Sequence, residues 1–140
     1  MYTARVKEVM DRKRRVVAAP GTSVARASKL MVKKNVGAIL VVEEKRLVGI
    51  FTERDAVFRV IAEDRDPRAT RLDEVMTREP RTISPEETFG VALLMMHEGG
   101  FRHVPVVKNG EPVGIVSSRS ALDPEMEEFV SETQRRIHLR

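Results

Sequence analysis

The sequence predicts a mixed α/β (α+β) fold in which two β-α-β-β-α repeats pack about a pseudo-twofold axis into one folding unit. The first observation is an internal duplication, because residues 20–57 align with residues 85–122 at an offset of 65 without a gap. Ten of the 38 aligned positions are identical, and most others keep their apolar or polar character. The second observation is size: a repeat of about 60 residues is too short to close a core alone, so the two repeats must share one.

Apolar spacing predicts the start of each repeat and its first helix. Residues 8–10 and 74–76 are both Glu-Val-Met, which places the openings at an offset of 66. Residues 84–87 read as a capping box with Pro85 at the first helical position of the second repeat. An apolar stripe follows in each helix, at Val24, Ala27, Leu30 and Met31 and at Phe89, Ala92, Leu93 and Met96.

Two apolar runs and a second helix complete each repeat. In the first repeat, residues 38–42 and 47–51 are predicted strands, and in the second the Asn-Gly at 109–110 is a strong hairpin signal. A helix is expected from Glu53 to about Glu63, with its equivalent from Arg119 to Leu122 or beyond. The predicted organisation is repeat 1 at residues 1–66, repeat 2 at residues 67–123, and a tail at residues 124–140 with an amphipathic helix at 125–137.

Composition excludes several classes of protein. The chain has no cysteine, which excludes a disulfide framework, a Cys-ligated metal and a thiol nucleophile. No apolar run approaches the ~20 residues of a membrane span, and the N-terminus lacks the apolar region of a signal peptide. The three histidines, His97, His103 and His138, lack metal-ligand spacing. We therefore expect a cytoplasmic protein with no metal site and no membrane anchor.

A positive charge excess lies in the first half of the chain. Of the 25 Lys and Arg residues 18 are Arg, and residues 1–66 carry a balance of +6 against −2 for residues 67–140. Residues 12–15, Arg-Lys-Arg-Arg, supply much of this excess. Since arginine suits forked contacts with phosphate, a nucleic-acid-binding protein that uses the basic N-terminal half is the alternative function. The run has no interleaved aromatic residue, and a solvated loop is the simpler interpretation.

The most informative string runs from Gly49 to Asp55, with a copy from Gly114 to Ser120. A strand ends, a hydroxyl follows at Thr52, and the carboxylate of Asp55 stands one helical turn further on. One interpretation is a capping box between Thr52 and Asp55. The other is a ligand site, in which the helix N-terminus and Thr52 meet a phosphate while Asp55 accepts hydrogen bonds from vicinal ribose hydroxyls. The two interpretations are compatible.

In their order, these features resemble a tandem pair of cystathionine-β-synthase (CBS) domains, known as a Bateman module. The resemblance covers about residues 4–123. It rests on the Val-Met openings, on Pro20 and Pro85 ahead of the first helices, on residues 101–107 (Phe-Arg-His-Val-Pro-Val-Val), and on the duplicated Gly-hydrophobic-x-Ser/Thr-x-x-Asp string. Each motif is degenerate by itself, but their duplicated order is specific.

The resemblance implies a cleft between the repeats that binds an adenosine-containing ligand such as S-adenosylmethionine or an adenine nucleotide, with AMP, ADP, ATP or NAD as the expected ligand. It implies that the acid of the motif holds the ribose, that the Ser/Thr lies near the phosphate, and that the loop before the Pro-containing strand of the other repeat completes the site. The residues that it assigns to the first cleft are Thr52, Arg54 and Asp55, faced by Phe101, Arg102, His103 and Pro105. Thr77 is a further candidate binding residue. Arg102 and His103 are of the right type for charge-assisted bonds to phosphate.

The second cleft departs from the pattern. Ser117 keeps the hydroxyl, but Ser120 replaces the ribose-binding acid. The facing loop offers Gly37 and Ala38, small enough to let an adenine approach the backbone, and contains no cation. We therefore expect this cleft to bind weakly, to bind another part of a ligand, or to stay empty, with nothing charged awaiting a phosphate.

The expected function is that of a stand-alone, non-catalytic regulatory protein that senses cellular energy or a metabolite. The resemblance implies a homodimer joined through the helices beside the sheets, and a downstream effector protein that the sequence does not name. No Ser–His–Asp order, nucleophile elbow or P-loop appears. An enzyme that acts on a nucleotide therefore ranks below both binding functions.

Overall fold

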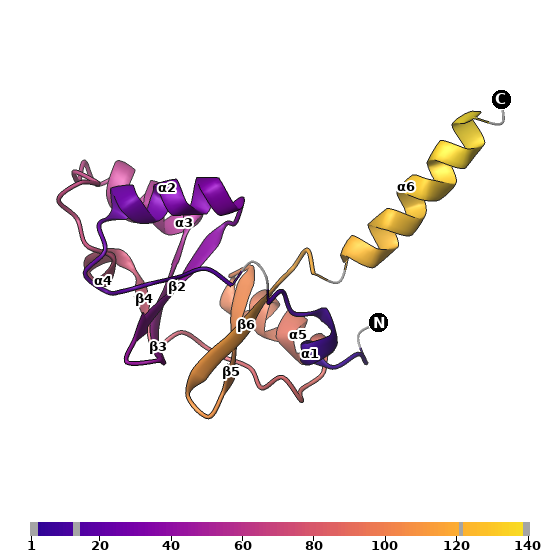
Figure 1. The fold of residues 1–140 in the computed structure, drawn as a ribbon, viewed down its shortest axis with the longest axis horizontal. Helices are drawn as coiled ribbons and strands as arrows, with labels where there is room; N and C mark the ends of the chain where they lie inside the picture. Colours follow the sequence, from indigo (N-terminus) through magenta and orange to yellow (C-terminus); the bar gives the residue numbers. More distant parts are fainter. Residues whose placement is uncertain (1–2, 13–14, 121, 139–140) are drawn as a thin grey trace.

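The fold is taken from a computed structural model that describes residues 3–12, 15–120 and 122–138, with side chains for all of these except residues 122–128. The chain forms two α/β lobes and a long C-terminal helix, α6 (Leu122–His138), which projects away from them (Figure 1). Lobe 1 contains the elements α2 to α4 and the strands β1 to β4. Lobe 2 contains α1, α5, β5 and β6.

Lobe 1 is built on a four-stranded sheet in the order β1-β2-β3-β4, in which β1 runs parallel to β2 and the other pairs are antiparallel. Its strands are β1 (Val17–Ala18), β2 (Ala38–Glu43), β3 (Arg46–Thr52) and β4 (Thr77–Arg78), and its helices are α2 (Val24–Lys34), α3 (Glu53–Asp55), the π-helix η1 (Ala56–Ile61) and α4 (Leu72–Val75). Helix α2 begins where Ser23 Oγ accepts a hydrogen bond from Arg26 N, and it ends at Asn35, whose positive φ stops the helix.

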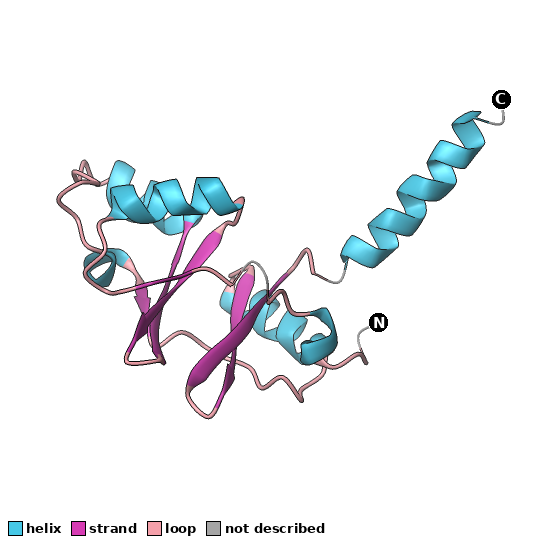
Figure 2. Ribbon diagram, viewed as in Figure 1, coloured by secondary structure: helices cyan, strands magenta, loops and turns pink. Residues whose placement is uncertain are grey.

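Lobe 2 is smaller, with a two-stranded antiparallel sheet made of β5 (His103–Lys108) and β6 (Glu111–Ser117). Its helices are α1 (Val6–Val9) and α5 (Phe89–Gly99), seen in cyan against one side of the hairpin in Figure 2. The tight turn between the strands has positive φ at both Asn109 and Gly110, as the Asn-Gly signal predicts. The predicted apolar stripe of α5 is confirmed, because Phe89, Ala92 and Met96 are buried.

The predicted capping box at residues 84–87 is wrong. Helix α5 begins at Phe89, after Thr88, and residues 84–87 form a turn in which Glu86 N donates to Ser84 Oγ. The reason lies in α1, which docks on this segment: Val6 N donates to Glu87 O at 2.7 Å, and Phe89 N donates to Ala4 O at 2.8 Å. These bonds hold the segment before Phe89 out of the helix.

The second helices of the two repeats differ. In repeat 1 the helical segment runs through α3 and η1 to Ile61, close to the predicted end. In repeat 2 the residues after β6 form a turn at residues 118–120, and the predicted helix merges with the predicted tail helix into α6. As a result η1 packs on the lobe 1 core through the buried Val60, whereas α6 extends away from both lobes.

The lobes exchange their first helical turns. Helix α1 opens repeat 1, yet Val6 is fully buried in the core of lobe 2 beside Phe89. Helix α4 opens repeat 2, yet Leu72 is fully buried in the core of lobe 1, and Leu72 N donates to Thr22 O at 2.9 Å. The packing units therefore differ from the sequence repeats by one exchanged segment each.

A small apolar cluster joins the lobes about the pseudo-twofold axis, with Ile50 of β3 and Ile115 of β6 at equivalent positions. The cluster is completed by Ala38 and Leu40 of β2. Leu47 N also donates to Gly110 O across the hairpin ends at 3.4 Å. Within the described ranges, no helix has both the length and the apolar character needed to cross a membrane.

Candidate functional site

A cavity of about 650 Å³ lies between the two lobes. Its walls come from α1 and the chain after it, the loop before β2, the start of β5, and the end of β6 with the turn that follows. The lining residues are Lys7, Glu8, Val9, Met10, Asp11, Arg12, Asn35, Val36, Gly37, Ala38, His103, Ile115, Ser117, Arg119 and Ser120. Both lobes therefore shape one cavity.

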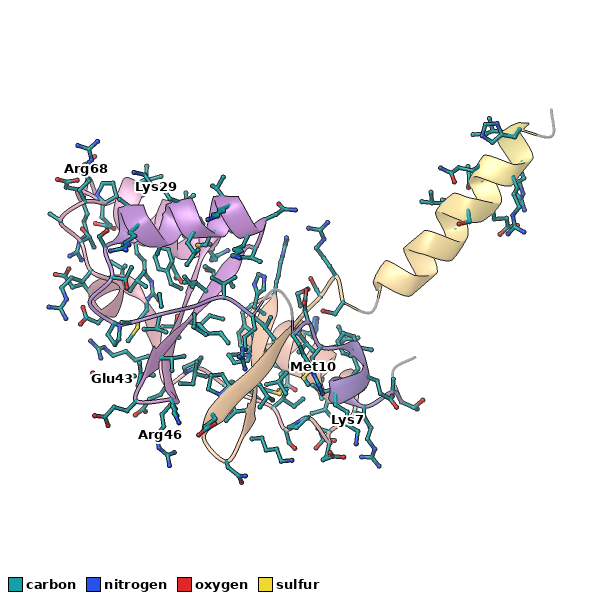
Figure 3. The ribbon with its side chains drawn as sticks, viewed as in Figure 1. Lys7, Met10, Lys29, Glu43, Arg46 and Arg68 are labelled. Atoms are coloured by element: carbon teal, nitrogen blue, oxygen red, sulfur yellow. The ribbon has the colours of Figure 1, made fainter. Side chains whose placement is uncertain are left out.

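The exchanged N-terminal segment forms one wall of this cavity. Asp11 N donates to Ile115 O at 2.9 Å, and Ile115 N donates back to Asp11 O at 3.3 Å, so the segment lies along β6. Gly114 allows this approach, because a Cβ there would lie 2.8 Å from Met10 Sδ. Figure 3 shows Lys7 and Met10 on this segment beside lobe 2.

The turn after β6 supplies hydroxyls to the cavity. Ser117 N donates to Ser120 Oγ at 2.9 Å, and the two hydroxyl oxygens lie 3.3 Å apart. Ser118 N donates to Arg102 O at 3.0 Å, which ties the turn to the loop before β5. Ser117 and Ser120 are both half-buried, and Arg119 between them is exposed.

The equivalent turn after β3 is a capping box, as one interpretation of the sequence predicts. Thr52 N and Thr52 Oγ1 donate to Asp55 Oδ2 at 2.9 and 3.1 Å, and Asp55 N donates to Thr52 Oγ1 at 3.3 Å. Asp55 is 8% exposed, and its other oxygen lies 3.6 Å from Arg59 Nε. The guanidinium of Arg54 stacks 4.2 Å above the ring of Phe58.

The remaining candidates lie on β4 and in or just before β5. Thr77 of β4 is exposed and pairs with Ile50 of β3. Phe101 packs against the core of lobe 2, and Pro105 is buried in β5, where its carbonyl accepts from Ile83 N at 3.1 Å. Arg102 is exposed just before β5.

Five of the twelve candidate residues, all of which are described, line the cavity. These are Gly37, Ala38, His103, Ser117 and Ser120. Thus the large cavity coincides with the second cleft, for which the sequence predicts the weaker site, while the remaining seven candidates are not among its lining residues.

His103 stands where the two lobes meet. Burial lowers the pKa of His103, the nearby carboxylate of Glu53 opposes this by raising it, and the charge of Arg102 lowers it further. A Cβ at position 37 would lie 2.6 Å from Glu53 Oε1 and 3.5 Å from His103 Cε1. The space above Gly37 is therefore filled by the protein's own side chains.

The prediction that nothing charged faces the second cleft is wrong. Lys7, Arg12 and Arg119 all line the cavity. Lys7 and Arg12 arrive on the exchanged N-terminal segment, which an alignment of the repeats does not place in lobe 2. The sequence could have pointed to Arg119, because this arginine aligns with Arg54 in the duplicated string.

Arg12, the first residue of the basic run at residues 12–15, therefore lines the cavity. Arg15 Nη1 donates to Pro112 O of β6 at 2.7 Å, which ties the end of the run to lobe 2. Lys13 and Arg14 lie outside the described residues. Among the residues that the structure covers, no group of three or more His, Asp or Glu side chains could hold a metal ion.

Comparison with known proteins decides the family. The CBS domain model matches this chain twice, at residues 6–62 and 72–124. The chain belongs to the CBS domain family. Its fold is that of the paired CBS repeats of a Bateman module, and each sequence repeat contains most of one matched range.

Relatives of this CBS pair are found both among curated sequences and among solved structures. The chain is 35% identical over 114 residues to the mitochondrial CBS domain-containing protein CBSX3 of Arabidopsis thaliana, a match that covers 78% of this chain and 55% of that protein. It is similar to an uncharacterized conserved protein from Pyrococcus horikoshii, with a TM-score of 0.82 and 28% identity, over 89% of this chain and 94% of the other. Across the first five curated relatives the covered share of the relative runs from 18% to 62%.

Two similar structures contain ligands. A CBS domain protein from Pyrobaculum aerophilum complexed with AMP has a TM-score of 0.76 and 28% identity, over 84% of this chain and 89% of the other. The CBS domain pair of protein MJ0100, in complex with 5′-methylthioadenosine and S-adenosyl-L-methionine, has a TM-score of 0.77 and 28% identity, over 84% and 96% of the two chains. Both ligand sets contain an adenosine group.

Proposed function

We propose that this CBS pair is a non-catalytic regulatory protein that binds an adenosine-containing ligand in the cavity between its lobes. The observation that carries the proposal is the cavity itself, about 650 Å³ in volume and walled by both repeats. Small-molecule sites typically measure about 300–1,000 Å³. The adenosine compounds bound by the two similar proteins support this choice of ligand.

The chemistry of the walls suits a nucleotide. Val36, Ala38 and Ile115 offer apolar surface for a flat purine ring. Ser117 and Arg119 offer hydroxyl and guanidinium donors, which form strong charge-assisted bonds to phosphate. A single ligand could therefore contact the apolar wall with its base and the polar turn with its charged part.

The cavity ranks ahead of the cleft at Thr52 and Asp55 as the binding place. Asp55 is almost buried, and its oxygens already face Thr52 and Arg59. A ribose there would have to share or displace these partners. The first cleft therefore remains the second candidate location for the same kind of ligand.

Regulation follows from the way the cavity is built. A ligand that touches both lobes favours the arrangement of lobes that it fits best, and it shifts that equilibrium by its differential affinity for the two arrangements. Reporting this state to an effector needs a contact surface. Exposed apolar side chains on η1 and α5 suit such a surface, which would contact a second copy of the chain or an effector protein. They are Val57, Phe58, Ile61, Val91 and Leu94.

Isothermal titration calorimetry tests the proposal. AMP, ADP, ATP, NAD, 5′-methylthioadenosine and S-adenosyl-L-methionine are titrated into the protein, with GMP as the base control. At least one adenosine compound should bind with a 1:1 stoichiometry and in preference to GMP. The Arg119→Ala variant should weaken binding of phosphate-bearing ligands, whereas Lys29→Ala on the distant helix α2 should leave it unchanged. Binding by none of the six compounds, or conversion of a bound nucleotide to product, contradicts the proposal.

A further inference from the structure

The turns after β3 and β6 carry opposite charge. Residues 52–55 are Thr-Glu-Arg-Asp, with a net charge of −1 from two acids and one base, whereas residues 117–120 are Ser-Ser-Arg-Ser, with a net charge of +1. Both acids of the first turn are replaced by serine, and the arginine is kept. A turn with the same backbone role thus changes from repelling an anion to attracting one.

We propose that the turn at Ser117–Ser120 binds a phosphate carried on the ribose of the ligand, so that the cavity prefers an adenine nucleotide phosphorylated at the 2′ or 3′ position. This inference rests on the proposed function, because it assigns the ligand class of the same cavity. The position occupied by the carboxylate of Asp55 in repeat 1 is the one that accepts an anion in repeat 2.

Hydrogen-bonding capacity supports the assignment. A carboxylate is an acceptor only and therefore suits the two O–H donors of a free ribose diol. A serine hydroxyl also donates, so it can bond to a phosphate oxygen, which a carboxylate cannot. Ser120 Oγ accepts from Ser117 N at 2.9 Å, and the two hydroxyls at 3.3 Å need only one proton between them. The other proton can point to the ligand.

The arginines of the two turns also differ in their surroundings. Arg54 stacks on Phe58, at 4.2 Å from its ring. Arg119 lines the cavity and is exposed, with no ion pair to any side chain that the structure describes. A planar guanidinium beside two hydroxyls matches the geometry of a phosphate group.

The remaining charges of the cavity leave this preference in place. Glu8 and Asp11 are acidic, and Lys7 and Arg12 are basic, so these four formally cancel. Glu8 Oε2 accepts from Arg5 N at 3.0 Å, and Lys7 Nζ pairs with Glu86 at 3.2 Å. By formal count Arg119 brings the lining residues to a net charge of +1, and it is the one base among them that lies at the serine turn.

At other nucleotide sites, replacing an acidic side chain by a neutral or basic one changes which form of the ribose is bound. In dinucleotide-binding folds, an Asp or Glu selects the free ribose 2′-hydroxyl, and an arginine in its place accommodates a 2′-phosphate. The same logic applies wherever one side chain faces the ribose, because a phosphate dianion and a carboxylate repel each other at contact distance.

The test compares three isomers that differ only in the position of one phosphate. Adenosine 5′-, 2′- and 3′-monophosphate are titrated by calorimetry into the wild-type protein. We expect the 2′ or the 3′ isomer to bind about tenfold or more tightly than the 5′ isomer, the effect of one additional charge-assisted hydrogen bond. Equal or tighter binding of the 5′ isomer overturns the inference and leaves the proposed function standing. Binding by none of the three overturns the inference, whereas the proposed function then depends on the titrations with the other five adenosine compounds.

Two variants with a matched control locate the effect. Ser120→Asp should abolish or reverse the preference, because it restores the acid of repeat 1. Arg119→Gln, which keeps the size and removes the charge, should reduce the preference by about tenfold. Arg68→Gln, at an exposed arginine that is not among the lining residues of the cavity, is the control and should leave the ratio unchanged. An unchanged isomer ratio in both Ser120→Asp and Arg119→Gln, with the wild-type melting temperature kept, contradicts the inference.

Discussion

The turn after β3 and the turn after β6 share one backbone hydrogen-bond pattern and differ in chemistry. Thr52 N donates to the side chain of Asp55 at 2.9 Å, and Ser117 N donates to the side chain of Ser120 at 2.9 Å. An acid or a hydroxyl serves equally as the acceptor that closes the turn. The fold thus leaves the charge of the fourth residue free to vary, and this is how one half of a duplicated protein can change its ligand without changing its shape.

The two cores show a similar exchange in apolar residues. Lobe 1 has Val24 on its helix and Phe51 on its strand, while lobe 2 has Phe89 at the equivalent helix position and Val116 at the equivalent strand position. Each core therefore contains one phenylalanine and one valine at this pair of sites, in opposite order. Total volume is kept although the positions are swapped, which is the kind of change that cores tolerate best.

The largest expected loss of stability comes from removing a buried phenylalanine ring from the core of either lobe. Phe51→Ala and Phe89→Ala should each lower the free energy of unfolding by about 3–5 kcal/mol, because both rings are fully buried and leave a cavity. Chemical denaturation measures this. If the lobes form one cooperative unit, each variant shifts a single transition, and two separate transitions would contradict that view. Val32→Ala, at a side chain of α2 that is 82% exposed, is the control and should change stability by less than about 0.5 kcal/mol.

The next largest loss of stability is expected from helix α4, which is exchanged between the lobes. Leu72→Ala should cost about 2–5 kcal/mol, since Leu72 is fully buried among lobe 1 residues. Although Leu72 belongs to repeat 2 in sequence, native-state hydrogen exchange should show the loss of protection first in β2 and β3 of lobe 1. An equal loss in β5 and β6 would show that the sequence repeat, and not the packing lobe, is the unit that opens.

Removing the side chain that accepts the hydrogen bond in each turn should lower the free energy of unfolding by different amounts in the two turns. Asp55→Ala is expected to cost about 1–2 kcal/mol, because it removes the bonds from Thr52 and the contact with Arg59. Ser120→Ala is expected to cost about 0.5–1 kcal/mol, because it removes one bond from a half-buried turn. Thermal melts of the two variants measure the difference, and a larger cost for Ser120→Ala would reverse the comparison.

The smallest effect is a dependence of stability on pH through His103. Its lowered pKa means that the unfolded chain binds a proton more readily than the folded chain, so the contribution of His103 is fully present above the unfolded pKa of about 6.5 and is lost as pH falls through the folded value. The groups that face His103 are Glu53 and Arg102, with Ser117 opposite it on β6. The slope from this group should stay below about 1.4 kcal/mol per pH unit.

Denaturation curves between pH 5 and pH 8 check this dependence. His103→Asn should flatten the fall in stability below about pH 6.5. His97→Asn, at an exposed position of α5, is the matched control and should leave the curve unchanged. A wild-type stability that rises as the pH falls through this window would contradict the direction given for the pKa of His103.

Much of the fold is visible in the sequence because it depends on short-range patterns. The duplication, the hairpin at Asn109 and Gly110, and the apolar stripe of α5 are all set by neighbouring residues, and each is confirmed. The start of α5 was predicted four residues too early. Its true start depends on bonds from Ala4 and Val6, more than 80 residues away, which no local pattern records.

The candidate site was predictable to the same degree. The resemblance to a CBS pair named Gly37, Ala38, His103, Ser117 and Ser120 as candidates, and the structure brings them around one cavity. Lys7 does not follow, because its place depends on the exchange of the N-terminal segment between lobes. The rank proposed for the two clefts differs from the one expected from the sequence, because an intact motif says nothing of how far Asp55 is buried by its own partners.

The exchange of α1 and α4 has a consequence for how such a protein could arise. A chain with one repeat would present a core that lacks its covering turn, together with a turn that has no core of its own to cover. Two such chains would complete each other by domain swapping, a low-cost route to a dimer. Duplication joins the two partners in one polypeptide, so each turn meets its lobe at the high effective concentration of a tether and no longer depends on the amount of protein in the cell.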